Sequence, residues 1–381
     1  MPPSLLLKSK NFISTLCLLL TSCGGSSSAP DSIETPVITP PGNISIPENN
    51  ITKNIQGDIS YLKLTNRDPD CGAYVGSYIA NIVDLQEGHI LESRLTITAT
   101  ATASHCTLIS NNIPNHDVGG NTTTGKNFET KVQANSNAYT LVIPRNPTKN
   151  ATPTYIEKIA AMLTLNGILL NGVDLDMDSA FCYHPDINAP LNIGLGTRQQ
   201  CGLNADWYAV PANNPDIVTL DEFTGHAFDG RYHYHGDNDG LSYVGSAETL
   251  SFNSNDVDPS GSPVIGFAAD GFPIYGHYIY DKKINAIRKV TSSWVTYTEE
   301  RVSPTGASVT APSINTHSRG IFVEDWYYEQ GRGDLDECNG MTDEYGNYGY
   351  YYTESYPYGP ICNFGQPDNS FTLESSAFIG E

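Results

Sequence analysis

One stretch of the chain, FTGHAFDGRYHYHGDNDGL, concentrates residue types that can bind a metal ion. Within it, Tyr232, His233, Tyr234 and His235 alternate two aromatic residue types. Tyrosine favours strands, and successive side chains on a strand point to opposite faces. The pattern within residues 223–241 therefore predicts a strand with His233 and His235 on one face and both tyrosines on the other.

A third imidazole completes the candidate site. His226 lies seven residues before His233, across a turn that contains Gly230, so the chain can fold back and bring it to the same point. Three neutral imidazoles suit a borderline metal such as zinc or copper. The alternative is that these histidines only pack or form hydrogen bonds in a polar groove, because short motifs also occur without function. We predict a divalent-metal site, for zinc or copper, built from His226, His233 and His235.

The same stretch resembles the signature of the YHYH-domain proteins, a largely uncharacterised bacterial family named after these four residues. The resemblance extends from about Cys71 to Cys362 and implies a site at the three histidines, but no particular reaction. Four further stretches carry it: IPNHD from Ile113, NGV from Asn171, IGFAADGFPIYG from Ile265 and GDLDECNG from Gly333.

This resemblance also draws attention to three other residues. His116, in a predicted loop, becomes a candidate fourth metal ligand or a group that supports the ligands. Asp270 follows an apolar run and could orient an imidazole through its second ring nitrogen. Asp270 equally suits the first residue of a glycine turn. Together with Tyr275, which lies in the same stretch, Asp270 is a candidate catalytic residue.

The first 22 residues have the pattern of a bacterial lipoprotein signal peptide. Lys8 and Lys10 form a positive region, and the apolar core that follows is too short for a permanent transmembrane helix. The core ends in LTSC, which makes Cys23 the expected lipidated first residue of the mature chain. A plain secretory signal cleaved nearby is the alternative. Gly24 follows Cys23, which implies an anchor in the outer membrane, facing the periplasm or the cell surface.

Composition divides the rest of the chain into two parts. Residues 23–57 are rich in Ser, Gly and Pro and poor in large apolar residues, which predicts a flexible tether. Residues 58–381 suffice for a sizeable core, and no second linker divides them. Alternation in residues 91–103 and the run YTLVI from Tyr139 predict strands, whereas residues 155–165 have weak helical potential. We expect a single, mainly β domain with short helices and long disulfide-stapled loops.

Cysteine use agrees with export. Six cysteines remain once Cys17 and Cys23 are set aside, and an even number in an exported chain favours disulfides. Six cysteines allow fifteen connectivities, and we expect the sequential one because each bridge then closes a local loop. The expected pairs are Cys71–Cys106, Cys182–Cys201 and Cys338–Cys362, which would leave no thiolate for a metal or for catalysis.

Charge and missing motifs narrow the function. The net charge of −22 argues against nucleic acid and anionic lipid headgroups as partners. The acidic runs 174–178, 237–240 and 334–337 suit Asx turns better than calcium, because calcium-loop spacing is incomplete. The sequence has no Gly-x-Ser-x-Gly elbow, no His-Glu-x-x-His and no phosphate-binding loop.

Two classes of function remain open. The first is a metalloprotein whose ion supports hydrolytic or redox chemistry. The second is a non-catalytic surface module that uses a Tyr/His groove to bind a carbohydrate or a peptide. The tyrosine-rich residues 345–358 could contribute to such a groove, although burial is the commoner role of such aromatic residues. The sequence does not decide whether the protein is an enzyme.

Overall fold

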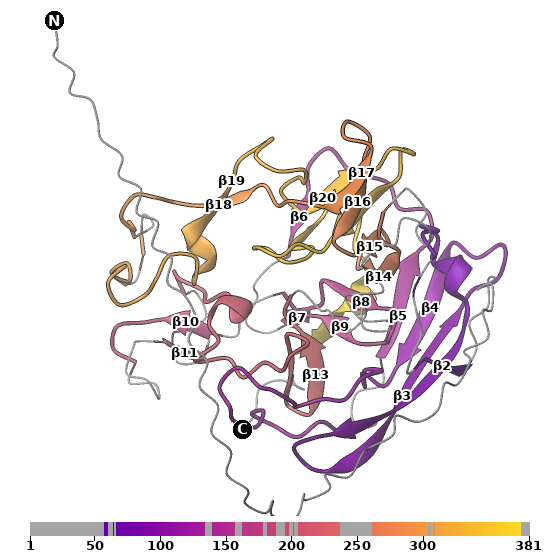
Figure 1. Cartoon of the computed structure of the whole chain (residues 1–381), viewed down its shortest axis with the longest axis horizontal. Coiled ribbons are helices and arrows are strands. Elements are labelled where there is room, and N and C mark those ends of the chain that lie inside the picture. Colours follow the sequence, from indigo (N-terminus) through magenta and orange to yellow (C-terminus); the bar gives the residue numbers. More distant parts are fainter. Residues whose placement is uncertain are drawn as a thin grey trace, which may run out of the picture. The chain divides into compact units, whose positions relative to one another are not determined.

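The structure is a computed structural model (Figure 1). The regular secondary structure of its described part consists mainly of strands, with 3-10 helices of three or four residues, so the predicted mainly β class is confirmed. No helix in this part is long and apolar enough to cross a membrane. The predicted signal peptide and nearly all of the predicted tether lie outside it. The described residues are 57–59, 64, 66–133, 139–156, 162–177, 181–187, 195–197, 201, 205–236, 261–303, 306–307 and 309–374.

A five-stranded sheet forms the N-terminal part of the fold. Its neighbouring strands are antiparallel except for β1 and β2, which are parallel. Along β2 and β3, exposed and buried residues alternate, so one face is wet and the other packs inward. In order across the sheet, the strands are β1 (Gly57–Asp58), β2 (Gly76–Asp84), β3 (His89–Thr98), β4 (His105–Ser110) and β5 (Tyr139–Pro144).

An eight-stranded mixed sheet carries the histidine stretch. Most of its strands are buried on both faces, which fits their runs of apolar residues. In order across the sheet, the strands are β12 (Gly225–Phe228), β13 (Arg231–Tyr234), β9 (Asp174–Leu175), β8 (Gly167–Leu169), β14 (Val264–Ala268), β15 (Pro273–Tyr275), β21 (Tyr348–Tyr351) and β20 (Gly340–Thr342).

Short strand pairs and helices complete the described part. The helical potential of residues 155–165 falls partly on residues outside it, and both ends of that stretch are strands. The pairs are β6 (Thr154–Tyr155) with β22 (Cys362–Asn363), β7 (Met162–Thr164) with β23 (Thr372–Glu374), β10 (Phe181–Tyr183) with β11 (Leu195–Thr197), β16 (Tyr278–Asp281) with β17 (Ala286–Lys289), and β18 (Trp294–Thr296) with β19 (Trp326–Tyr328). The helices are η1 (Cys71–Tyr74), η2 (Pro211–Asn213), η3 (Val323–Asp325) and η4 (Asn369–Phe371).

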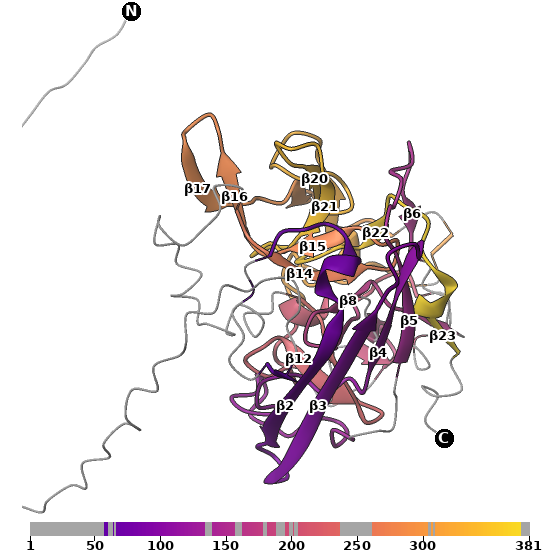
Figure 2. The same ribbon diagram turned by 90° about the vertical axis from the view of Figure 1, so that its right-hand side faces the viewer.

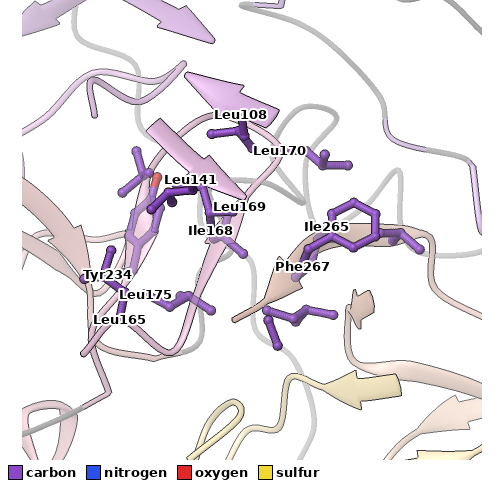
Figure 3. Packing of buried hydrophobic residues seen from close by; sticks show 14 of the residues in the cluster. Leu108, Leu141, Leu165, Ile168, Leu169, Leu170, Leu175, Tyr234, Ile265 and Phe267 are labelled. Carbon is purple, nitrogen blue, oxygen red and sulfur yellow. The ribbon is translucent and has the colours of Figure 1, made fainter. Parts of the chain in front are cut away.

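One large apolar core joins the two main sheets, which lie side by side in Figures 1 and 2. Leu108 and Leu141 from the five-stranded sheet belong to the same buried cluster as Ile168, Leu175 and Phe267 from the eight-stranded sheet (Figure 3). The core therefore fixes β8 and β9, the strands next to the histidine hairpin.

The tyrosine-rich segment belongs largely to this core. In β21, Tyr348, Tyr350 and Tyr351 are buried, and Tyr351 stacks on Tyr275 of β15 with ring centroids 5.0 Å apart. Tyr345 is the exposed exception. Most of these tyrosines pack inside the protein and do not form a surface platform.

Three disulfides connect the sequential pairs. Cys71–Cys106 joins η1 to β4, and Cys338–Cys362 joins the segment before β20 to β22. Cys182–Cys201 links β10 to the segment that follows β11. All six cysteines of the described part are therefore oxidised, and none offers a thiolate.

Candidate metal centre

A tight hairpin places the first two histidines side by side. Strands β12 and β13 are antiparallel, and His226 is the direct partner of His233. The two residues between the strands, Asp229 and Gly230, have φ values of +52° and +76°. This is the turn conformation that Asp-Gly sequences favour in two-residue hairpins, because it matches the twist of the strands.

The alternation of β13 separates its side chains by chemistry. Tyr232 and Tyr234 are 0 % exposed and belong to the apolar core. His233 and His235 lie on the other face, where they meet His226 of β12. The backbone N–H of His235 donates to the carbonyl of Thr224 at 2.9 Å, which holds this residue against the hairpin just beyond the end of β13.

The three imidazoles form a compact triangle. Ring centroids lie 4.6 Å apart for His226 and His233, 4.7 Å for His233 and His235, and 5.0 Å for His226 and His235. One ring nitrogen of each lies within 4.8 Å of the others. The Nε2 atoms of His226 and His235 are 3.1 Å apart. The residues are 4 %, 3 % and 5 % exposed, in chain order, so the triangle is buried.

Hydrogen bonds at the opposite ring nitrogens orient two of the rings. Nδ1 of His226 donates to Oε2 of Glu129 at 3.0 Å, and Nδ1 of His233 donates to the carbonyl of Arg231 at 3.2 Å. An imidazole that donates from Nδ1 keeps its lone pair on Nε2, and this is how ligand histidines are usually oriented. Nδ1 of His235 has no hydrogen-bond partner in the described part of the chain.

The surroundings keep two of these histidines neutral. Burial lowers the pKa of His233 well below its usual range, and the charge of Arg231 lowers it further. Burial likewise lowers the pKa of His235, with His226 as the next cause. Both rings are therefore unprotonated at neutral pH and need not release a second proton to bind a cation.

A buried ion-pair network lies on the histidine face of the sheet. Arg231 donates from Nη1 to Asp174 and from Nη2 to Asp176, the latter at 3.0 Å. The two aspartates flank Leu175 of β9, which pairs in parallel with Tyr234. Burial raises the pKa of Asp174 to about 6, although the charge of Arg231 opposes the shift. Both carboxylates therefore accept hydrogen bonds from this guanidinium.

The other acidic runs also have internal partners. Asp336 accepts from the backbone N–H groups of Cys338 and Gly340, which is an Asx turn, and Asp334 pairs with Arg288. Asp178 and residues 237–240 lie outside the described residues. The carboxylates of Asp334 and Asp336 are therefore engaged by groups of the protein itself.

His116, predicted as a fourth ligand or a supporting group, does not belong to the triangle of His226, His233 and His235. Its Nε2 accepts from the phenol of Tyr234 at 2.6 Å, and its Nδ1 donates to the carbonyl of Asp117 at 2.7 Å. Because Tyr234 points to the opposite face of β13 from His233, His116 lies on the core side of the strand. Its ring packs on Phe223 with centroids 3.7 Å apart.

Asp270 and Tyr275 lie elsewhere in the sheet, several strands away from β13. Asp270 accepts from the phenol of Tyr350 at 2.6 Å and from the backbone N–H of Gly365 at 2.8 Å, so it orients a tyrosine and not an imidazole. Its alternative reading, the first residue of a glycine turn, fits Gly271, whose φ is +88°. Tyr275 stacks beneath Arg67, 4.5 Å from the ring centroid. Neither residue contributes to the histidine site.

Sequence reasoning missed the groups around the ligands. Arg231 could have been placed on the histidine face, because it lies two residues before His233 on the same strand. Glu129 gave no comparable signal, since it lies 97 residues before His226 in the chain. Asp174 and Asp176 were noticed only as an acidic run.

Together these features define a disulfide-bonded, mainly β protein with a buried three-histidine centre. A family model described as "YHYH protein" matches residues 140–365, more than half of the chain, so the chain belongs to the YHYH family. No curated protein and no solved structure matches it. The three histidines and the ion-pair network lie within the matched residues, whereas Glu129 and His116 precede them.

The environment of His116 predicts a pH dependence of stability. Burial lowers the pKa of His116 to about 4. Between pH 6.5 and about 4, His116 is therefore protonated in the unfolded chain but neutral in the folded chain. Stability from this group is present above pH 6.5 and is lost as the pH falls towards 4. Because part of the residue is exposed, we expect a loss of roughly 1 to 3 kcal/mol.

Urea unfolding of the parent and of His116→Gln, at several pH values between 7 and 4, isolates this contribution. The parent should be the more stable of the two at pH 7, and the gap should narrow as the pH falls. A gap that stays constant over this range would contradict the prediction.

Proposed function

We propose that His226, His233 and His235 bind one divalent metal ion, zinc or copper. The convergence of three buried imidazoles, two of them held through Nδ1 with Nε2 directed inward, carries this proposal. Two nitrogens bound to one ion at about 2.05 Å in a tetrahedral site lie about 3.3 Å apart. The observed separation between the Nε2 atoms of His226 and His235 is 3.1 Å, close to that value.

The charges around the histidines also suit a dication. Glu129 borders His226, while Asp174 and Asp176 lie on the same sheet face, so there are three carboxylates against one guanidinium, that of Arg231. A divalent cation would be attracted by this excess of carboxylates over guanidinium.

A hydrogen bond between imidazoles is the plain alternative. His235 could donate from Nε2 to Nε2 of His226, since 3.1 Å is also an ordinary hydrogen-bond distance. That reading gives no role to the third ring, whose Nε2 has no hydrogen bond in the described part. Metal binding accounts for all three rings at once.

Three nitrogen ligands would leave a coordination position for water or a substrate. A zinc ion in such a site lowers the pKa of bound water and polarises substrate oxygens, whereas a copper ion gives access to redox chemistry. The disulfides remove sulfur from the ligand set, which leaves imidazole as the ligand type. Imidazole suits Zn(II) and Cu(II) alike.

A carbohydrate- or peptide-binding groove of tyrosines and histidines has weaker support. Tyr232 and Tyr234 are buried in the core, as are Tyr350 and Tyr351 of the tyrosine-rich segment. Side chains in that position cannot stack on a ligand at the surface. The metal centre is therefore the better supported of the two functions.

Elemental analysis tests the proposal directly. The exported chain, purified without a His tag or a chelator, should contain about one zinc or copper ion per molecule. His233→Ala/His235→Ala should contain none, because one ligand cannot hold the ion alone. The element found would point to hydrolytic or redox chemistry.

A matched double variant controls for the loss of two histidines. His89→Ala/His105→Ala removes two exposed imidazoles of the five-stranded sheet, and it should keep the parent's metal content. If the parent contains no metal and takes up neither zinc nor copper, the site is not a metal centre.

Glu129 should tune the affinity without binding the ion. Glu129→Ala removes the acceptor of the His226 Nδ1–H group and should weaken metal binding by about 10- to 100-fold. Glu129→Gln should weaken it less, since an amide oxygen still accepts this hydrogen bond. Glu222→Ala, which removes an exposed carboxylate without contact to the triangle, should leave the dissociation constant unchanged. Competition titration with a metal indicator measures all four proteins.

We further propose that a lipid on Cys23 anchors the protein in the cell envelope, in the outer membrane. The support is the charged, apolar and LTSC pattern of the first 23 residues, with Gly24 behind the cysteine. Labelling with a radioactive fatty acid in a bacterial host should mark the parent and not Cys23→Ser. Equal labelling of both, or of neither, would refute the lipid anchor.

A further inference from the structure

We infer that Arg231 is a positioning residue for the metal centre and sets the orientation of two of its three ligands, His233 and His235. This inference rests on the proposed metal site. The side chain of Arg231, together with Asp174 and Asp176, would hold the imidazole rings in the orientation for binding before an ion is present.

The first connection runs through the backbone. The carbonyl of Arg231 accepts from Nδ1 of His233 at 3.2 Å. This contact selects the ring tautomer whose Nε2 carries the lone pair. The position of that carbonyl depends on how the Arg231 end of the strand is held.

The second connection runs through Asp176. Nη2 of Arg231 donates to Oδ2 of Asp176 at 3.0 Å, and the backbone N–H of Asp176 donates to the carbonyl of Tyr234 at 3.0 Å. These bonds fix Asp176 beside β13, next to His235. Oδ1 of Asp176 and Nδ1 of His235 are both buried without a hydrogen-bond partner in the described part. Asp176, whose backbone lies within hydrogen-bonding reach of the His235 ring, thus offers an acceptor for that ring when it turns its lone pair on Nε2 towards an ion.

Stability alone explains the network poorly. Arg231 and Asp174 are 3 % and 0 % exposed, and removing such charges from water costs about as much as their attraction returns. Apolar residues of similar size often serve as well in a protein interior. An arginine fork held by two carboxylates does, however, fix direction as well as distance. Three imidazoles can bind one ion together only if the lone pairs of all three rings point at the same place, so a rigid neighbour that fixes ring direction is useful to such a site.

The test compares Arg231→Lys and Asp176→Asn with the parent as full-length chains loaded with Cu(II) or Zn(II). Lysine keeps the charge but loses the fork. Asparagine keeps the shape of Asp176 but weakens its bond to Arg231. Each variant should bind Zn(II) about 10- to 100-fold more weakly than the parent, and each should show a changed hyperfine pattern in the electron paramagnetic resonance spectrum of its Cu(II) form.

Arg301→Lys is the matched control. Arg301 and Asp325 form a second buried fork, 3 % and 2 % exposed, with bonds of 2.6 and 2.8 Å and no contact to the three histidines. This variant should lose thermal stability in the same way but keep the parent's Cu(II) spectrum and its affinity for Zn(II). It separates a general loss of packing from misplaced ligands.

The outcomes are distinguishable. If the parent binds no metal, the proposed function fails. If the parent binds metal and either folded variant keeps the parent's spectrum and dissociation constant, the metal site stands and the role of Arg231 is overturned. Asp176→Asn, which exchanges a single heavy atom, remains informative if Arg231→Lys does not fold.

Discussion

Strand β13 is buried on both faces, and the rest of the centre depends on that constraint. A strand in this position cannot leave any polar side chain in water, so each must find a partner inside the protein. On the tyrosine face, the aromatic rings pack in the core and their phenol groups form hydrogen bonds to buried partners, such as Tyr232 to Asp221. On the histidine face, His226 and Arg231 form hydrogen bonds with carboxylates from outside the hairpin.

These carboxylates come from distant parts of the chain. Asp174 lies in β9, which the core holds beside β13, and Asp176 follows this strand directly. Glu129 lies on the segment that leads to Gln133. The backbone N–H of Gln133 donates to the carbonyl of Gly230 at 3.0 Å, so this segment is attached to the tip of the hairpin. The apolar core and the hairpin turn therefore act together to bring charges of both signs to one buried face.

Local pattern was enough to predict the centre of the site. Alternation placed His233 and His235 on one face, and the Asp-Gly turn predicted that His226 could fold back, since both signals act over a few residues. The same kind of signal gave the strands at residues 91–103 and 139–143, although β3 ends at Thr98. Glu129 and Asp176 could not be predicted as partners, because the sheet order that brings them close is set by long-range packing. His116 could not be placed from the sequence. It lies on the tyrosine face of β13, and the spacing of its motif along the chain does not tell on which face of that strand it packs.

The family match begins between the segment that carries Glu129 and the hairpin that carries the three histidines. The three histidines and Arg231 lie in the matched residues, while Glu129, which holds His226, comes from the segment before them. His226 and the acceptor of its Nδ1–H group therefore come from separate segments of the chain. A change in the supporting segment can alter how firmly one ring is held while the hairpin that carries the ligands stays intact. If the three histidines bind an ion as proposed, mutations in the supporting segment would change the affinity for that ion in small steps while all three histidines stay in place.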